Sequence, residues 1–158
     1  MTLSSTGSNP FLFACGVPRS GTTLLQRMLN SHPQLAVAND SHFIPRALEL
    51  TDKSLVARAV AGLPVPLTEE LAGNVRDYHR FHRLGISPEQ FSRAVSESDT
   101  YQALVSNLYI LHGRNEGKPL AGEKTPDYAR RLALLHGMFP RARLIHLIRD
   151  GRNVSNSD

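Results

Sequence analysis

The chain has 158 residues, of which 41% are apolar and 20% are charged, an ordinary composition for one globular domain. Its single cysteine, Cys15, excludes an internal disulfide framework and a zinc site built from several cysteines. Lys and Arg outnumber Asp and Glu by 18 to 14, and the net charge of +4 favours an anionic partner. Since the basic residues form no stripe interleaved with aromatic residues, we expect no nucleic-acid binding.

The first nine residues form a run of small and polar residues, which predicts a flexible lead-in over 1–9 and a single domain over 10–158. This N-terminus has neither a basic segment nor a long apolar one, so no secretory signal is expected. No apolar run approaches the ~20 residues of a membrane span. These features favour a cytoplasmic location.

The apolar segment 11–17 predicts a strand that is buried on both faces, as in a parallel sheet. Pro18-Arg19-Ser20-Gly21 ends this strand. Residues 22–30 then predict a helix with Leu24, Leu25, Met28 and Leu29 on one face. A strand, a tight loop and a helix therefore form the first unit.

A second short strand is predicted at 35–38, followed by a helix over 43–50. Residues 51–117 predict a helical insert with helices at 67–84 and 88–95 and a third helix capped by Asp99. The segment 76–83 contains His79 and His82, which are typical of a solvated helix face because no cluster of carboxylates or cysteines accompanies them.

Residues 120–122 predict a weak strand, and a helix is expected from Pro126 to Gly137. Residues 143–148 predict another buried strand, which Arg149-Asp150-Gly151-Arg152 connects to a last helix. The alternation of strands and helices predicts an α/β fold with three layers, a central parallel sheet and helices on both faces. Because the chain stops within the last helix, we expect the fold to be incomplete at its C-terminus.

The loop 16–23 lies between a buried strand and a helix, where backbone N–H groups at a helix start bind an anion. The arrangement is therefore P-loop-like. The loop that binds nucleoside triphosphates has the pattern GxxxxGK[ST], whose lysine reaches the terminal phosphates. Here Thr22 occupies the lysine position, which disfavours an ATP- or GTP-dependent enzyme, and a positive charge lies inside the loop at Arg19.

With that substitution, the loop resembles the 5′-phosphosulfate-binding motif of sulfotransferases that use 3′-phosphoadenosine 5′-phosphosulfate (PAPS). The segment 144–157 resembles the family's 3′-phosphate-binding motif, an apolar strand that ends in Arg149 with Ser157 eight residues later. Ser157 would lie about one and a half to two turns into the next helix, so both side chains can converge on one phosphate. The tyrosylprotein sulfotransferase-like branch also shares His32-Pro33 and Ile44-Pro45-Arg46.

This resemblance implies roles for individual residues. Asp40 corresponds to the catalytic base of the branch, with a shorter side chain than the family's Glu, and His42 is an alternative base. Lys124 corresponds to a lysine near the transferring group, where it and Arg19 would neutralise charge. No metal is implied. The residues implied in binding PAPS are Arg19, Ser20, Gly21, Thr22, Thr23, Arg149 and Ser157.

The expected function is transfer of a sulfuryl group from PAPS to an acceptor hydroxyl or amine, leaving 3′,5′-bisphosphoadenosine. Two alternatives are an atypical P-loop nucleotide kinase and a non-catalytic nucleotide-binding fragment, the latter because the chain stops at Asp158. The matched motifs lie within 10–46 and 119–157, so acceptor specificity is expected in 47–118. The class of acceptor and the oligomeric state stay open.

Overall fold

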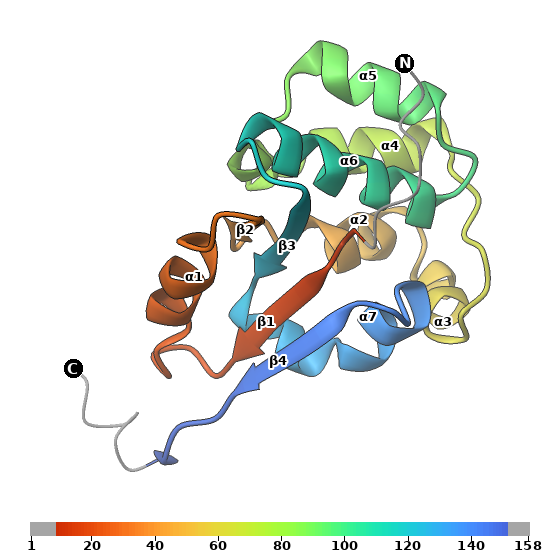
Figure 1. Ribbon diagram of the computed structural model, residues 1–158. Coiled ribbons are helices and arrows are strands. Elements are labelled where there is room, and N and C mark those ends of the chain that lie inside the picture. The colour runs from red at the N-terminus through yellow and green to blue at the C-terminus, as the bar shows by residue number, and fades with distance from the viewer. Residues whose placement is uncertain (1–8, 152–158) are drawn as a thin grey trace.

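The computed structural model describes residues 9–151, and a parallel four-stranded sheet in the order β2-β3-β1-β4 forms its centre (Figure 1). Its strands are β1 (Leu12–Gly16), β2 (Leu35–Asn39), β3 (Leu120–Lys124) and β4 (Arg143–Leu147). Ala14 of β1 lies opposite Lys124 on one side and Ile145 on the other. Because parallel strands end at the same edge of a sheet, the segments that follow them meet there.

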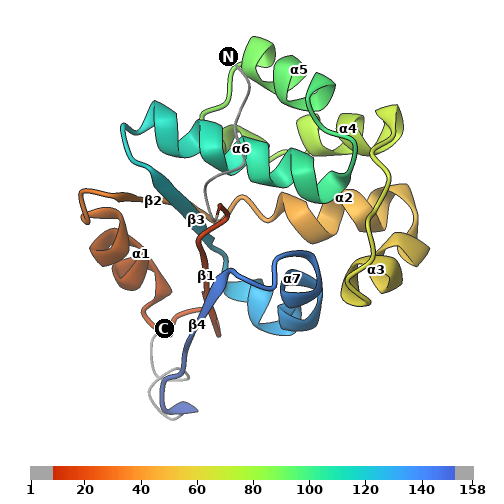
Figure 2. The ribbon, with the colours of Figure 1, turned by 45° about the vertical axis from the view of Figure 1, so that its right-hand side comes forward.

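Helices cover both faces of the sheet, as the alternation of elements predicts (Figure 2). Alternate residues of β1 point to opposite faces. Leu12 and Ala14 pack with β2 and with helix α1 (Thr22–Asn30). Phe13 and Cys15 belong to the larger core, which contains helices α2 (Phe43–Thr51), α6 (Tyr101–Asn115) and α7 (Leu132–Met138). The predicted three-layer α/β fold is confirmed.

The segment between β2 and β3 is largely helical, but its predicted helix at 67–84 is wrong. Helix α4 ends at Arg76, and a separate 3-10 helix, η1, follows at Phe81–Leu84. The residues around this end, Asn74 and Asp77, are weak helix formers, which explains the break. The other helices of the segment are α3 (Lys53–Val60), α4 (Glu69–Arg76) and α5 (Pro88–Ser96).

Two helix starts also differ from expectation. Thr100, and not Asp99, caps α6, because the Thr100 hydroxyl accepts a hydrogen bond from the backbone N–H of Ala103 at 3.2 Å. The helix expected from Pro126 is a short 3-10 helix, η2 (Pro126–Arg130), and α7 begins only after it. These differences shift boundaries and leave the order of elements unchanged.

Strand β4 lies at the edge of the described sheet and is largely exposed, so the prediction of a buried strand at 143–148 is wrong. Leu144 is 38% exposed, and Ile148, which follows the strand, is 80% exposed. Part of the apolar side of α1 is exposed as well, with Leu24 at 64% and Met28 at 63%, whereas its neighbours Leu25 and Leu29 pack against the sheet. An edge strand has a partner on one side only, which periodicity alone does not reveal.

The described part of the domain includes the last residue of the expected lead-in. Asn9 is buried, and its side chain donates to the carbonyl of Pro119 and accepts from the N–H of Ala121. Residues 1–8 and 152–158, with the predicted site residue Ser157, lie outside the described residues. Within 9–151, the helices are too short or too polar to cross a bilayer.

Candidate functional site

The loop between β1 and α1 makes a tight turn that presents the start of the helix. Ser20 folds back on it, since its hydroxyl and its N–H both donate to the carbonyl of Val17, at 2.5 and 3.1 Å. Arg19 and Gly21 have positive φ values of 68° and 96°. Helix α1 begins at Thr22, and the first N–H groups of a helix have no acceptor within it. The turn therefore aims N–H groups at the carboxyl edge of the sheet.

Gly16 allows this loop to lie close to β4. A Cβ atom on Gly16 would come within 2.7 Å of the carbonyl oxygen of Leu147 and within 3.0 Å of the Ser20 hydroxyl. Backbone and side-chain atoms thus occupy the space that any larger residue would need. Thr22 is buried beside this glycine, whereas Thr23 is exposed.

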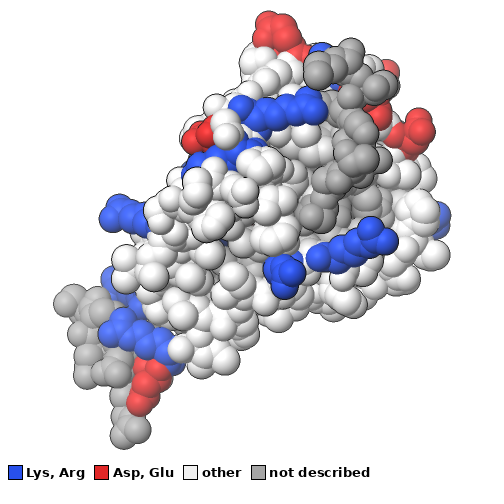
Figure 3. All heavy atoms as spheres, in the orientation of Figure 1, with Lys and Arg blue, Asp and Glu red and all other residues white. Residues whose placement is uncertain are grey.

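Arg149 brings the end of β4 to the same loop. Its guanidinium donates a hydrogen bond of 3.2 Å to the backbone carbonyl of Arg19, 130 residues earlier in the chain. The two arginines that the sequence assigns to opposite ends of one nucleotide therefore lie on adjoining segments. Lys and Arg side chains are spread over the face seen in Figure 3, and some of them lie at the end of the molecule to which β1 and β4 run, beside an acidic side chain. The closeness of the two arginine segments favours binding of an anion there.

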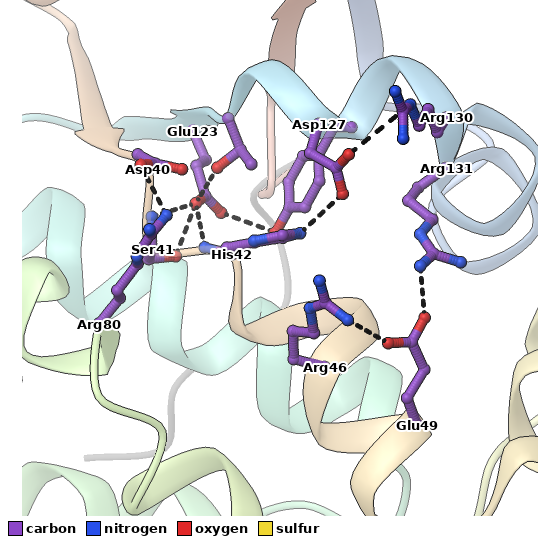
Figure 4. A network of polar contacts seen from close by, with 12 residues as sticks. Asp40, Ser41, His42, Arg46, Glu49, Arg80, Glu123, Asp127, Arg130 and Arg131 are labelled. Atoms are coloured by element: carbon purple, nitrogen blue, oxygen red, sulfur yellow. Dashed lines mark hydrogen bonds and ion pairs between the residues drawn. The ribbon is translucent and has the colours of Figure 1, made fainter. Parts of the chain in front are cut away.

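The turn between β2 and α2 holds both predicted bases in a left-handed conformation. Asp40 and His42 each have φ of 57°. The Asp40 N–H donates to the carbonyl of Lys124 at 2.6 Å, which ties the turn to the end of β3. The Asp40 carboxylate accepts from Arg80 at 2.8 Å (Figure 4). It also accepts from Arg83 at 3.2 Å. Asp40 is thus fixed from its backbone and from its side chain.

Lys124 lies at the carboxyl end of β3, opposite Ala14 of β1 and Asn39 of β2. It is buried, and burial lowers the pKa of its ammonium group, while the nearby Asp40 carboxylate acts in the opposite direction. The register places this cation between the β1–α1 loop and the Asp40 turn. Lys124 and Asp40 therefore lie at the same edge of the sheet.

His42 is buried beside a second carboxylate. Its Nε2 atom lies 3.1 Å from Oδ2 of Asp127, and its ring makes an edge contact with Tyr128. Burial lowers the pKa of His42 below its usual value, although Asp127 acts to raise it. The neutral imidazole is therefore the form that the fold favours, and a neutral imidazole is able to accept a proton.

A cavity of about 500 Å³ opens beside these residues. Asp40 and His42 line it together with Pro18 of the β1–α1 loop, so it is continuous with the loop that presents Arg19. The wall of the cavity is formed by the segments that follow β1, β2 and β3, together with the turn before η1. Its other lining residues are Arg46, Tyr78, His79, Arg80, Pro126 and Asp127.

Two features of the site are absent from the sequence-based prediction. The basic run at 76–83 appeared to be solvated, yet Arg80 and Arg83 reach Asp40. Glu123 is fully buried among hydrogen-bond donors. Glu123 follows the predicted strand 120–122 directly and lies within β3 in the structure. A carboxylate in such a strand indicates a buried polar site, because carboxylates are almost never fully buried without partners.

Among the residues that the structure describes, no three His, Cys, Asp or Glu side chains are grouped as metal ligands.

Comparison with known proteins bears on what this edge does. The model of the sulfotransferase family matches residues 10–158. The chain belongs to the sulfotransferase family. The match includes both the β1–α1 loop and the segment after β4, so the resemblance noted in these two motifs extends over the whole described domain.

Relatives from animals are similar over most of the chain. Protein-tyrosine sulfotransferase A of Caenorhabditis elegans is 28% identical over 150 residues, which are 95% of this chain and 33% of the relative. Human protein-tyrosine sulfotransferase 1 is 30% identical over 143 residues, 90% of this chain and 32% of the relative. The Drosophila melanogaster protein-tyrosine sulfotransferase is 27% identical over 148 residues, 94% of this chain and 25% of the relative. The chain thus spans about a third of the length of the first two relatives.

Proposed function

We propose that this protein transfers a sulfuryl group from PAPS to an acceptor hydroxyl or amine. The contact between the Arg149 guanidinium and the Arg19 carbonyl is the single observation that carries the proposal, because it joins the two segments that the donor's two phosphate groups require. Family membership supports the same activity.

The residues present fit such a donor. The start of α1 offers N–H groups and the hydroxyls of Thr22 and Thr23 to a 5′-phosphate. Gly16 leaves room for the close approach of the loop to β4. Arg149 would bind the 3′-phosphate, with Ser157 as its predicted partner outside the described residues. When bound, PAPS supplies an activated sulfuryl group on its 5′-phosphate.

The chain's own residues would provide proton transfer and charge neutralisation. Asp40 lines the cavity beside the loop and would accept the proton of the acceptor, with His42 as the alternative base. Lys124 and Arg19 lie on the segments at either side and would stabilise negative charge at the 5′-phosphate. In a site from which water is partly excluded, such fixed charges act more strongly than they would in bulk water.

The acceptor is proposed from the relatives. Those described above are named protein-tyrosine sulfotransferases, so a tyrosine hydroxyl in a peptide is the first acceptor to test. The cavity wall supplied by Tyr78, His79 and Arg80 comes from the segment in which we expect specificity. The cytoplasmic location expected from the N-terminus stays a prediction.

Titration with 3′,5′-bisphosphoadenosine and with ATP, each with and without magnesium, tests the donor class. We expect metal-independent preference for the bisphosphate. Magnesium-dependent binding and turnover of ATP would instead support the kinase alternative, which Thr22 in place of the P-loop lysine disfavours. Transfer of radiolabelled sulfate from PAPS to a tyrosine peptide then separates an enzyme from a non-catalytic nucleotide-binding module.

A further inference from the structure

Glu123 lies in β3 next to Lys124, but its side chain is fully buried on the opposite face of the sheet, toward the larger core. Its Oε1 atom accepts hydrogen bonds from the Ser41 N–H at 2.6 Å, the Ser41 hydroxyl at 2.7 Å and the His42 N–H at 2.9 Å. The Thr125 hydroxyl donates to the same oxygen at 2.6 Å. One carboxylate oxygen therefore holds the β2–α2 turn to the end of β3.

The other oxygen, Oε2, is held by the helical layer. The Tyr109 hydroxyl of α6 donates to it, and the Tyr128 hydroxyl of η2 donates at 3.2 Å. Both phenols are fully buried, and burial raises their pKa values well above the usual range, so both remain protonated donors. Since a buried carboxylate is costly without such donors, this set of contacts is a built site and not a chance packing of polar groups.

The turn that Glu123 holds is strained. Asp40 and His42 both have positive φ, a conformation that non-glycine residues seldom adopt. Ser41 lies between them and is held by its hydrogen bonds to Glu123. Strained residues persist where surrounding contacts determine their conformation. Asp40 and His42 line the cavity, whereas Glu123 holds the turn through Ser41 and through the backbone N–H of His42.

We propose that Glu123 is a positioning residue. Its buried carboxylate fixes the turn 40–42 and thereby places the catalytic base, Asp40 or His42, beside the β1–α1 loop. The proposal rests on the proposed function for its catalytic consequence. The conformational part concerns the turn alone and holds whatever reaction the site performs.

Hydrogen exchange measured by mass spectrometry tests the conformational part. In Glu123→Ala, amides of the peptide containing Ser41 and His42 should exchange at least about tenfold faster than in the unmodified chain, while the peptides of α5 keep their protection. Glu123→Gln keeps an oxygen for the two amides and should retain most of the protection. Unchanged exchange at 41–42 in Glu123→Ala, or an equal rise along the whole chain, would overturn the proposal.

Kinetics tests the consequence for catalysis. Glu123→Ala should lower kcat on the order of 10²-fold, because a displacement of about 1 Å is enough for such a loss, while KM for PAPS changes less than about threefold. Tyr101→Phe is the matched control, since Tyr101 is equally buried and its hydroxyl donates to the Ile44 carbonyl at 2.9 Å, whereas the Tyr109 and Tyr128 hydroxyls donate to Glu123. It should lower stability but leave kcat unchanged.

A shorter carboxylate keeps the proposal testable if Glu123→Ala does not fold. Glu123→Asp retains the charge but withdraws the oxygens from the turn, so it should also accelerate exchange at 41–42 and lower kcat more than Glu123→Gln does. Wild-type activity in Glu123→Asp with unaltered exchange would refute the positioning role. A failure of the proposed function would appear differently, as no sulfuryl transfer by the unmodified chain.

Discussion

The guanidinium of Arg149 donates a hydrogen bond to the backbone carbonyl of Arg19, so the segment after β4 is attached directly to the turn before α1. The contact uses the backbone carbonyl of Arg19, whose φ is positive. Two cationic residues that are distant in the sequence are thereby placed at one edge of the sheet, where we propose that the donor's phosphates bind.

Arg19→Ala should lower turnover by about 10² to 10³-fold, the usual effect of removing one preorganised charge stabiliser. The side chain is exposed, so the melting temperature should stay near that of the unmodified chain. Arg27→Ala, a change at an exposed position of α1, is the control and should leave both turnover and melting temperature unchanged. Equal turnover in Arg19→Ala and the unmodified chain would refute the role assigned to Arg19.

Arg149→Ala should weaken the binding of 3′,5′-bisphosphoadenosine more than that of adenosine 5′-phosphate, because only the former carries the phosphate that Arg149 is expected to bind. Isothermal titration calorimetry with both nucleotides measures the difference. If the two affinities fall by the same factor, Arg149 acts only by holding the Arg19 loop, and the 3′-phosphate assignment is wrong.

Substitution of the two candidate bases, Asp40 and His42, distinguishes which of them accepts the proton. If Asp40 is the base, Asp40→Asn should lower kcat by about 10² to 10⁴-fold, whereas His42→Asn should cost less than about tenfold. Asparagine suits both positions because it tolerates positive φ. A larger loss in His42→Asn, with a rate that rises as the imidazole loses its proton, would transfer the role to His42.

Protonation of His42 should destabilise the fold. Burial lowers its pKa in the folded chain, so below about pH 6.5 the unfolded chain binds this proton more readily. The free energy of unfolding should therefore fall as the pH decreases from 6.5 toward the lower folded pKa, and should not depend on His42 at higher pH. Urea titrations at several pH values measure this trend. His42→Asn should flatten it, and His136→Asn, at an exposed position, should not.

Gly16→Ala should lower the free energy of unfolding by roughly 1 to 3 kcal/mol, since the added methyl group would clash with the Leu147 carbonyl. Gly73→Ala is the control. At Gly73 the nearest atom to an added Cβ is the flexible end of Arg76 at 3.9 Å, so alanine should raise stability by up to about 1 kcal/mol. Denaturant unfolding measures the free energy of unfolding of both variants. An unchanged value in Gly16→Ala would mean that the loop does not need this close approach.

The sequence was informative where local pattern determines structure. The strand, loop and helix around Arg19 follow from hydrophobic periodicity and from turn residues, and so does the position of Lys124 at a strand end. The edge position of β4 did not follow, because the order of strands is set by long-range pairing. The contacts of Arg80 and Arg83 with Asp40 were missed for a similar reason, since they depend on where α4 ends.

The pairing of β1 with β4 has a consequence for biosynthesis. A ribosome releases Arg19 well before it has made Arg149, so until β4 has been synthesised the nascent chain lacks one side of the proposed anion-binding edge. Closing so long a loop to form parallel pairs is slow. Nucleotide should therefore associate only after β4 has docked, and should then stabilise the folded state by mass action.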